Sequence, residues 1–321
     1  MSDDINGSDG GAVARRTLLA GAAALPFAAG AAGASPRKGT GVQPYRFLQV
    51  DVFSPERFRG NPLAVVVGAD DLTDDDMKLF SRWTNLSETT FLMRPSRPDA
   101  DYRVRIFSVG EELPFAGHPT LGTCHAWLAS GGKPRGEIIV QECPIGLVRL
   151  HRTSGRLAFE APPLRRASPM DAEMLARVRK GLGLTDAEIV ATSVLDAGLE
   201  QPALMIRSRA RLLELKPDWS ALGMEALGVI APFSDRPAPG QPDFEVRMFD
   251  VTLANFEDPV TGSLNASLAR WLIGAGLAPE HYVASQGTVL GRTGRIHVDQ
   301  DADGLWIGGD TTTRIEGVLN L

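Results

Sequence analysis

Two short stretches of this 321-residue chain recur in the same order about 140 residues further along. Residues 104–109 (VRIFSV) match residues 246–251 (VRMFDV) as V-R-x-F-x-V, and residues 119–128 (PTLGTCHAWL) match residues 259–268 (PVTGSLNASL) as P-x-x-G-[ST]-x-x-A-x-L. Solenoid repeats are roughly 20–50 residues long, so this separation predicts two copies of one domain instead. Each copy would hold a strand followed by a central helix. Chance similarity of the blocks is the alternative.

Alternating and β-branched segments around these blocks indicate many strands and few helices. The predicted strands are 46–53, 63–67, 89–93, 102–107, 137–140, 146–151, 156–160, 201–207 and 244–249, with short strands in the Gly-rich tail, and the predicted helices are 73–84, 119–130, 171–182 and 259–274. This β-rich order is typical of an α+β fold and not of regular βαβ alternation.

The predicted domain boundaries follow from the repeat and from a Pro-rich connection. We expect a first domain over residues 45–162 and a second over 163–321, with the last strand left free to return to the first. Residues 161–168 look like the connection between them, and residues 35–44 like a linker that precedes them.

The first 34 residues are not expected to belong to the fold. Arg15 and Arg16 precede an uncharged, Ala- and Gly-rich run over residues 18–34 that ends in an A-x-A pattern. A paired arginine before a weakly hydrophobic run resembles a twin-arginine export signal, which predicts a periplasmic protein. A cytoplasmic protein with a disordered extension is the alternative. The run is too short and too weakly apolar for a stable membrane span.

Composition excludes several classes of protein. The net charge of −6 and an aromatic content of 7% give neither a basic stripe nor a base-stacking platform, so no nucleic-acid partner is expected. Two cysteines, Cys124 and Cys143, are too few for a disulfide scaffold and are predicted to be buried packing residues. The five histidines lie in separate segments or seven residues apart, so we assign no metal.

The repeat itself points to a functional site. It aligns His118 with Asp258, each just before a predicted helix, where free backbone N–H groups favour an anion. Gly117 and Gly262 permit close backbone approach to a ligand. If the two copies face each other, His118 on one side and Asp258 with Ser263 on the other line one cleft. Taken singly, His118 could be a structural histidine and Asp258 an ordinary helix cap.

Five blocks carry a resemblance to a known family. They are residues 60–65 (GNPLAV), 85–91 (NLSETTF), 114–122 (PFAGHPTLG), 257–263 (EDPVTGS), and 286–287 (QG) followed by 291–292 (GR). Together, from about residue 45 to the C-terminus, they resemble the PhzF-like phenazine-biosynthesis isomerase family. The resemblance implies a diaminopimelate-epimerase-like fold, in which two similar domains each wrap a curved sheet around a central helix and the active site lies between them. It also implies a homodimer, a small-molecule substrate, and no metal or organic cofactor.

The resemblance assigns roles to residues of these blocks. Glu88, in NLSETTF, corresponds to the general acid/base of the family, and His118, Asp258 and Ser263 line its substrate site, with Gly117 contributing backbone. The family's parent reaction moves a proton along a cyclic dihydro-hydroxyanthranilate. Removing a proton from carbon requires a base whose pKa a dry site raises toward neutrality, which suits a carboxylate such as Glu88.

The chain also departs from related patterns. Epimerases of this fold use two cysteines, but Ala116 occupies the first of these positions and the Asp258–Pro259 segment has no thiol, which disfavours two-thiol racemisation. Residues 249–255 (FDVTLAN) differ from the Ala-Pro-Gly-rich form of the family, which bears on substrate choice. The sequence thus predicts a cofactor-independent isomerase. A non-catalytic small-acid binding protein and a related tautomerase or lyase remain alternatives.

Overall fold

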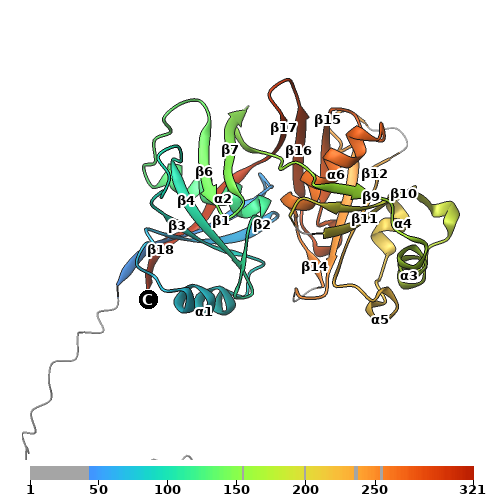
Figure 1. Ribbon diagram of the computed structural model, residues 1–321, viewed down its shortest axis with the longest axis horizontal. Coiled ribbons are helices and arrows are strands. Elements are labelled where there is room, and N and C mark those ends of the chain that lie inside the picture. Colours follow the sequence, from blue (N-terminus) through green and yellow to red (C-terminus); the bar gives the residue numbers. More distant parts are fainter. Residues whose placement is uncertain (1–42, 154, 199, 235–237, 254–255) are drawn as a thin grey trace, which may run out of the picture. The chain divides into compact units, whose positions relative to one another are not determined.

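The computed structural model describes residues 43–153, 155–198, 200–234, 238–253 and 256–321 (Figure 1). The predicted export signal, residues 1–34, lies outside the described residues, so the signal and the localisation stay predictions. None of the described helices is long and apolar enough to cross a membrane.

Two series of elements make up most of the described chain. The first series is β1 (Pro44–Val52), β2 (Asn61–Val67), α1 (Asp74–Thr84), β3 (Thr89–Met93), β4 (Tyr102–Ser108), β5 (Glu111–Leu113), α2 (Gly117–Ala129), β6 (Ile139–Cys143), β7 (Gly146–Thr153) and β8 (Arg156–Glu160). The second series is β10 (Ile189–Asp196), β11 (Glu200–Ile206), α4 (Arg209–Glu214), α5 (Trp219–Leu222), β12 (Ala226–Pro232), β13 (Phe244–Asp250), β14 (Glu257–Asp258), α6 (Gly262–Gly274), β15 (His281–Gln286), β16 (Gly294–Gln300) and β17 (Leu305–Gly309). The remaining elements are β9 (Arg166–Ser168), α3 (Ala172–Leu182), two 3-10 turns (Asp186–Glu188 and Thr288–Leu290) and β18 (Thr311–Asn320).

The two series pair their strands in the same order. In the first, β1–β2 is antiparallel, β2–β3 parallel, β3–β4 and β4–β5 antiparallel, β4–β6 parallel, and β6–β7–β8 antiparallel. In the second, β10–β11, β11–β12, β12–β13, β13–β14, β13–β15 and β15–β16–β17 repeat this pattern strand for strand. The duplication predicted from two short blocks therefore extends over the whole topology, and the predicted α+β class is confirmed.

A helix lies at the centre of each series. Helix α2 contacts β1, β2, β3, β4 and β8, and α6 contacts β10, β16 and β17 (Figure 1). Both helices are apolar on most of their surface, and Leu121, Cys124, Leu264 and Leu268 are fully buried in one continuous core. A helix that is apolar all round is stable only when it is enclosed, which is why each sheet curves around its helix. Cys124 and Cys143 are free and buried, as predicted.

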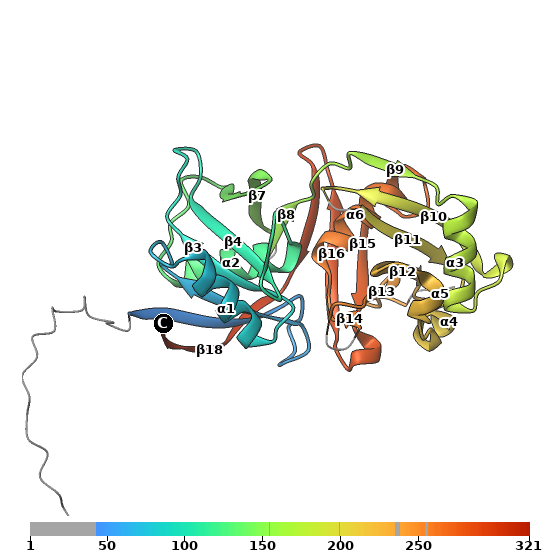
Figure 2. The ribbon, with the colours of Figure 1, turned by 60° about the horizontal axis from the view of Figure 1, so that its bottom comes forward.

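The two series exchange strands at their ends. Strand β8 pairs with β17, while β9 pairs with β10, and β18 pairs along its length with β1 (Figure 2). The end of the chain therefore lies beside its first described strand. The segment expected to be only a connection contains β9, because the partner strand that extends it lies in the second series and leaves no local sequence signal. The predicted boundary at residue 162 stays a prediction.

Candidate functional site

The N-termini of the two central helices meet. Gly117 is the first residue of α2 and Gly262 the first residue of α6. A Cβ atom added to Gly117 would lie 2.7 Å from Gly262 Cα, and one added to Gly262 would lie 2.9 Å from Gly117 Cα. Only glycine tolerates so close a backbone approach. Two helix ends with unsatisfied N–H groups thus converge, an arrangement that favours an anionic group.

The predicted equivalence of His118 and Asp258 is wrong. Both central helices have 13 residues, so equal positions make His118, the second residue of α2, the counterpart of Ser263 in α6. Asp258 lies in β14 before the helix cap, Thr261, and its counterpart in the short strand β5 is Leu113. The sequence alignment was shifted by its prolines, since proline suits both the first turn of α2 and the segment before α6.

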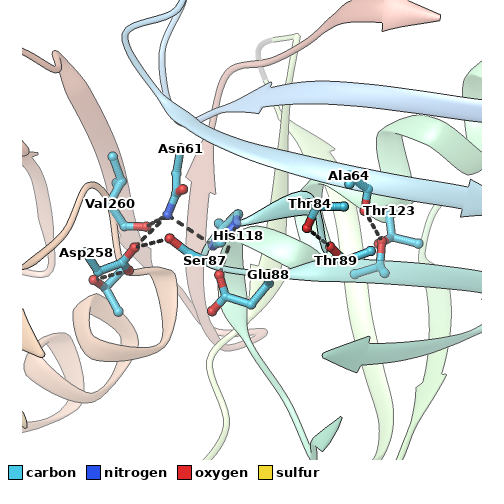
Figure 3. A network of polar contacts seen from close by, with 12 residues as sticks. Asn61, Ala64, Thr84, Ser87, Glu88, Thr89, His118, Thr123, Asp258 and Val260 are labelled. Carbon is cyan, nitrogen blue, oxygen red and sulfur yellow. Dashed lines mark hydrogen bonds and ion pairs between the residues drawn. The ribbon is translucent and has the colours of Figure 1, made fainter. Parts of the chain in front are cut away.

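Glu88 and His118, both from the first series, face each other (Figure 3). Glu88 directly precedes β3, its side chain is 14% exposed, and its Oε2 lies 3.5 Å from His118 Nε2. Burial, followed by the charges of Asp258 and Asp250, raises the pKa of Glu88 well above its ordinary value. Burial lowers the pKa of His118 to about 3. At neutral pH the site therefore combines a neutral imidazole with a carboxyl group that can hold a proton.

Asp258 reaches the same group of side chains from the second series. Its Oδ1 accepts hydrogen bonds from Asn61 Nδ2 at 2.9 Å and Ser87 Oγ at 3.3 Å, and its Oδ2 accepts one from Thr261 Oγ1 at 2.6 Å (Figure 3). Burial raises the pKa of Asp258 to about 6, and these three donors oppose the rise. Asp258 is thus a buried carboxyl group that its donors favour in the ionised form.

Four polar residues of the site were not predicted as site residues. Asn61, Thr261 and Gln286 are buried, and Ser87 is half-buried beside Glu88. All four lie inside the blocks that carry the family resemblance. The signal was therefore in the sequence, but only the three-dimensional contacts show which block members touch Asp258.

Ser263 is the predicted site residue least connected to this network. It is the second residue of α6 and lines a small cavity of about 40 Å³ together with Phe115 and the β10–β11 turn. Among the described contacts it makes no side-chain hydrogen bond to Glu88, His118 or Asp258. It stands beside the converging helix ends, where a substrate group could reach its hydroxyl.

A larger cavity, of about 300 Å³, adjoins the network on another side. Asn61 and Ser87 line it, and its charged lining residues are Arg82, Arg292 and Glu257. Arg292 donates to the backbone carbonyl of Phe58 at 2.7 Å, so it is held in place. A cavity with basic groups beside two carboxyl groups has room for a small polar molecule that carries a negative charge.

No thiol pair flanks the site, and the described residues contain no metal-binding cluster. The cap positions of α2 and α6 are Ala116 and Thr261. Within the described parts of the chain, no three His, Cys, Asp or Glu side chains are placed to hold a metal ion. The chemistry available to the protein's own groups here is that of carboxyl, imidazole and hydroxyl groups.

Comparisons with known proteins agree with this architecture. Residues 50–317 match a family model described as phenazine biosynthesis-like protein. The chain is 32% identical over 294 residues to antisense-enhancing sequence 1 of Schizosaccharomyces pombe, covering 85% of this chain and 98% of that protein. It is 33% identical over 272 residues to the trans-2,3-dihydro-3-hydroxyanthranilate isomerase of Pseudomonas aeruginosa, covering 81% and 92%. A PhzF-family crystal structure from Enterococcus faecalis superimposes with a TM-score of 0.70 at 25% identity, covering 87% of this chain and all of the other.

Proposed function

The chain belongs to the phenazine biosynthesis-like protein family and is an isomerase, and we propose that it moves a proton on a small, cyclic, carboxylate-bearing substrate with Glu88 as the acid/base. The observation that carries this proposal is the position of Glu88. Its carboxyl group is shielded from water, faces a neutral imidazole, and has a pKa raised well above the ordinary value. A carboxyl group with these properties can take a proton from carbon and return it to another atom of the same substrate.

The remaining site residues bind and orient the substrate in this proposal. The converging N-termini at Gly117 and Gly262 offer N–H donors to its carboxylate, and Ser263 adds a hydroxyl group. His118 donates a hydrogen bond from Nε2 to the substrate, and Asp258 contributes a negative charge beside it. No step draws on a group outside the chain, and the proposed reaction requires no cofactor.

The substrate class rests on the named relative, which is a trans-2,3-dihydro-3-hydroxyanthranilate isomerase. We therefore propose unsaturated cyclic amino and hydroxy acids as candidates, with that dihydro-hydroxyanthranilate as the first probe. Residues 249–255 depart from the family pattern, and two of them, Thr252 and Leu253, line the larger cavity. The preferred substrate of this chain is therefore expected to differ in shape.

The test is proton NMR of each candidate with the protein in D₂O. We expect deuterium uptake or isomerisation with the unaltered protein and a loss of at least about 100-fold in Glu88→Gln. The matched control is Glu225→Gln, since Glu225 directly precedes β12, the counterpart of β3, but is exposed. Equal turnover in Glu88→Gln and the unaltered protein would refute the role of Glu88.

The competing function is a small-acid binding protein that uses the helix ends and performs no chemistry. It predicts chemical-shift changes on binding, no exchange with any candidate, and equal affinity in Glu88→Gln. Twin-arginine export and a homodimer are separate proposals. Cell fractionation of the unaltered protein and of Arg15→Lys/Arg16→Lys tests export. Analytical ultracentrifugation, which gives the mass of the protein in solution, tests the homodimer.

A further inference from the structure

The hydrogen bonds behind Asp258 begin at fixed backbone groups, which determines the direction of each bond. Gln286 Oε1 accepts from the backbone N–H of Thr261 at 3.0 Å and from Asn265 Nδ2 at 2.9 Å. Because a backbone N–H can only donate, this end of the Gln286 amide is its oxygen. The Gln286 Nε2 group therefore donates, to the carbonyl of Asp258 at 3.1 Å and to Thr261 Oγ1 at 2.9 Å.

The hydroxyl group of Thr261 links Gln286 to Asp258, so the donor role of Gln286 bears on the donor and acceptor roles at Asp258. Since Thr261 Oγ1 accepts from Gln286, its own hydrogen is free to point at Asp258 Oδ2, 2.6 Å away. In that orientation, Asp258 Oδ2 is the acceptor of the short bond. A proton on it would face the hydroxyl hydrogen of Thr261 directly.

Asn61 fixes the other oxygen in the same way. Its Nδ2 donates to the backbone carbonyl of Val260 at 2.9 Å, which identifies the nitrogen end of the amide, and to Asp258 Oδ1 at 2.9 Å. The same Nδ2 lies 3.3 Å from His118 Nδ1. Both hydrogens of that amide group are used by Val260 and Asp258, and an amide nitrogen accepts no hydrogen bond. A hydrogen on His118 Nδ1 would therefore face Asn61 without an acceptor, so the proton of the neutral imidazole lies on Nε2, which faces Glu88.

From these contacts we infer that Thr261, oriented by Gln286, and Asn61 are positioning residues that hold Asp258 as a carboxylate at neutral pH and His118 as its Nε2–H form. Glu88 is then the group of the network that exchanges a proton with substrate. The role of Glu88 in exchanging a proton with substrate rests on the proposed function. The protonation states of Asp258 and His118 belong to the protein without substrate. The two carboxyl groups then have different tasks, although both are buried in the same network.

The charged groups around Asp258 agree with this division. Glu88 and His118 face it from the first series, and Asp250 adds negative charge from the end of β13. The neighbouring Glu257 is paired with Arg247. Repulsion between carboxylates raises the pKa of the one with fewer donors. Asp258 has three donors, whereas Glu88 Oε2 has no hydrogen-bond partner among the described residues.

The test is an NMR titration of the protein without substrate, with ¹³C-labelled side-chain carboxyl groups and ¹⁵N-labelled histidine. Glu88→Gln and Asp258→Asn assign the two carboxyl signals. We expect Asp258 to titrate below Glu88, and His118 to carry its proton on Nε2. A higher pKa for Asp258 than for Glu88, or a protonated Nδ1, would overturn the inference.

Thr261→Val then removes the donor and keeps the shape of the side chain. The pKa of Asp258 is expected to rise by about one to two units, and Thr261→Ser is expected to restore it. If Thr261→Val does not fold, Ser87→Ala removes the longer bond from a half-buried position and is expected to give a smaller rise. An unchanged pKa of Asp258 in the variant that folds contradicts the inference. These results are independent of turnover, so retained activity in Glu88→Gln would remove the proposed function and leave the protonation states standing.

Discussion

The same ion pair occurs at equivalent places in the two series, once near the surface and once in the interior. Arg105 in β4 binds Glu112 in β5 through Nε and Nη2, at 2.8 and 2.6 Å, and binds Asp74 through Nη1. Arg247 in β13 binds Glu257 in β14 in the same manner, at 3.0 and 2.6 Å. The Arg105 and Glu112 side chains are 21% and 32% exposed, while those of Arg247 and Glu257 are 6% and 4% exposed.

The residue that follows each glutamate explains why one ion pair is exposed and the other is buried. Leu113 follows Glu112 and contributes to packing, whereas Asp258 follows Glu257 and belongs to the candidate site. Arg247 also donates to the carbonyls of Leu212 and Leu215 at the end of α4. One duplicated strand pair thus serves as a solvent-facing edge in the first series and as the buried support of a site carboxylate in the second.

Breaking the two ion pairs should have very different effects. Arg247→Met leaves Glu257 buried without its partner and is expected to lower the free energy of unfolding by about 3–5 kcal/mol. Arg105→Met, the matched variant, is expected to lower it by about 1 kcal/mol or less, because water reaches Glu112. Urea denaturation measures both. Equal losses would contradict the comparison, and recovery of stability in Arg247→Met/Glu257→Met would confirm the unpaired charge as the cause.

The buried carboxylate of the second series should make stability depend on pH. The pKa of Asp258 is raised from 3.8 to about 6 in the folded protein, so the folded state binds a proton more tightly than the unfolded state. The stability from this proton is therefore complete below about pH 4 and is lost as the pH rises to about 6, by on the order of 2–3 kcal/mol. Chemical denaturation at several pH values should show this fall, and Asp258→Asn should flatten it. If Asp258→Asn leaves the dependence of stability on pH unchanged, another titrating group causes it, and Glu88 is the first candidate.

The sequence predicted the fold more completely than the site. The blocks around Arg105 and Arg247 revealed the duplication, because a buried strand followed by an enclosed helix leaves a recognisable pattern of apolar residues. Strands β5, β9, β10, β12 and β14 were not predicted, and three of them, β5, β9 and β14, have only two or three residues, too few for a periodic pattern. Glu88, His118 and Asp258 were identified and do gather together, but Asn61 and Gln286 were not, because the bonds that give them their roles join residues up to about 200 positions apart, beyond what local patterns report.

The two central helices touch at equivalent glycines, Gly117 and Gly262, and the next variants test whether the contact is symmetrical. Gly117→Ala and Gly262→Ala each place a Cβ atom 3 Å or less from the facing backbone. Because backbone cannot move aside cheaply, each is expected to lower the free energy of unfolding by about 1–3 kcal/mol, with similar values for both. Gly136→Ala is the control, since nothing lies within 4 Å of its added Cβ. Thermal unfolding measures all three, and a loss confined to one glycine would show that the contact is not symmetrical.

The smallest effect is expected at the far ends of the same helices. The last residue of α2 is Ala129 and the last residue of α6 is Gly274, and both are exposed. A Cβ added to Gly274 meets nothing within 4 Å, so Gly274→Ala removes only the conformational entropy of glycine and is expected to stabilise the protein by about 0.5–1 kcal/mol. Ala129→Gly should cost a similar amount in the first series. Since neither residue touches the site, deuterium exchange of a substrate should be unchanged in both, and a change in turnover would mean that the helix ends are coupled to the cleft.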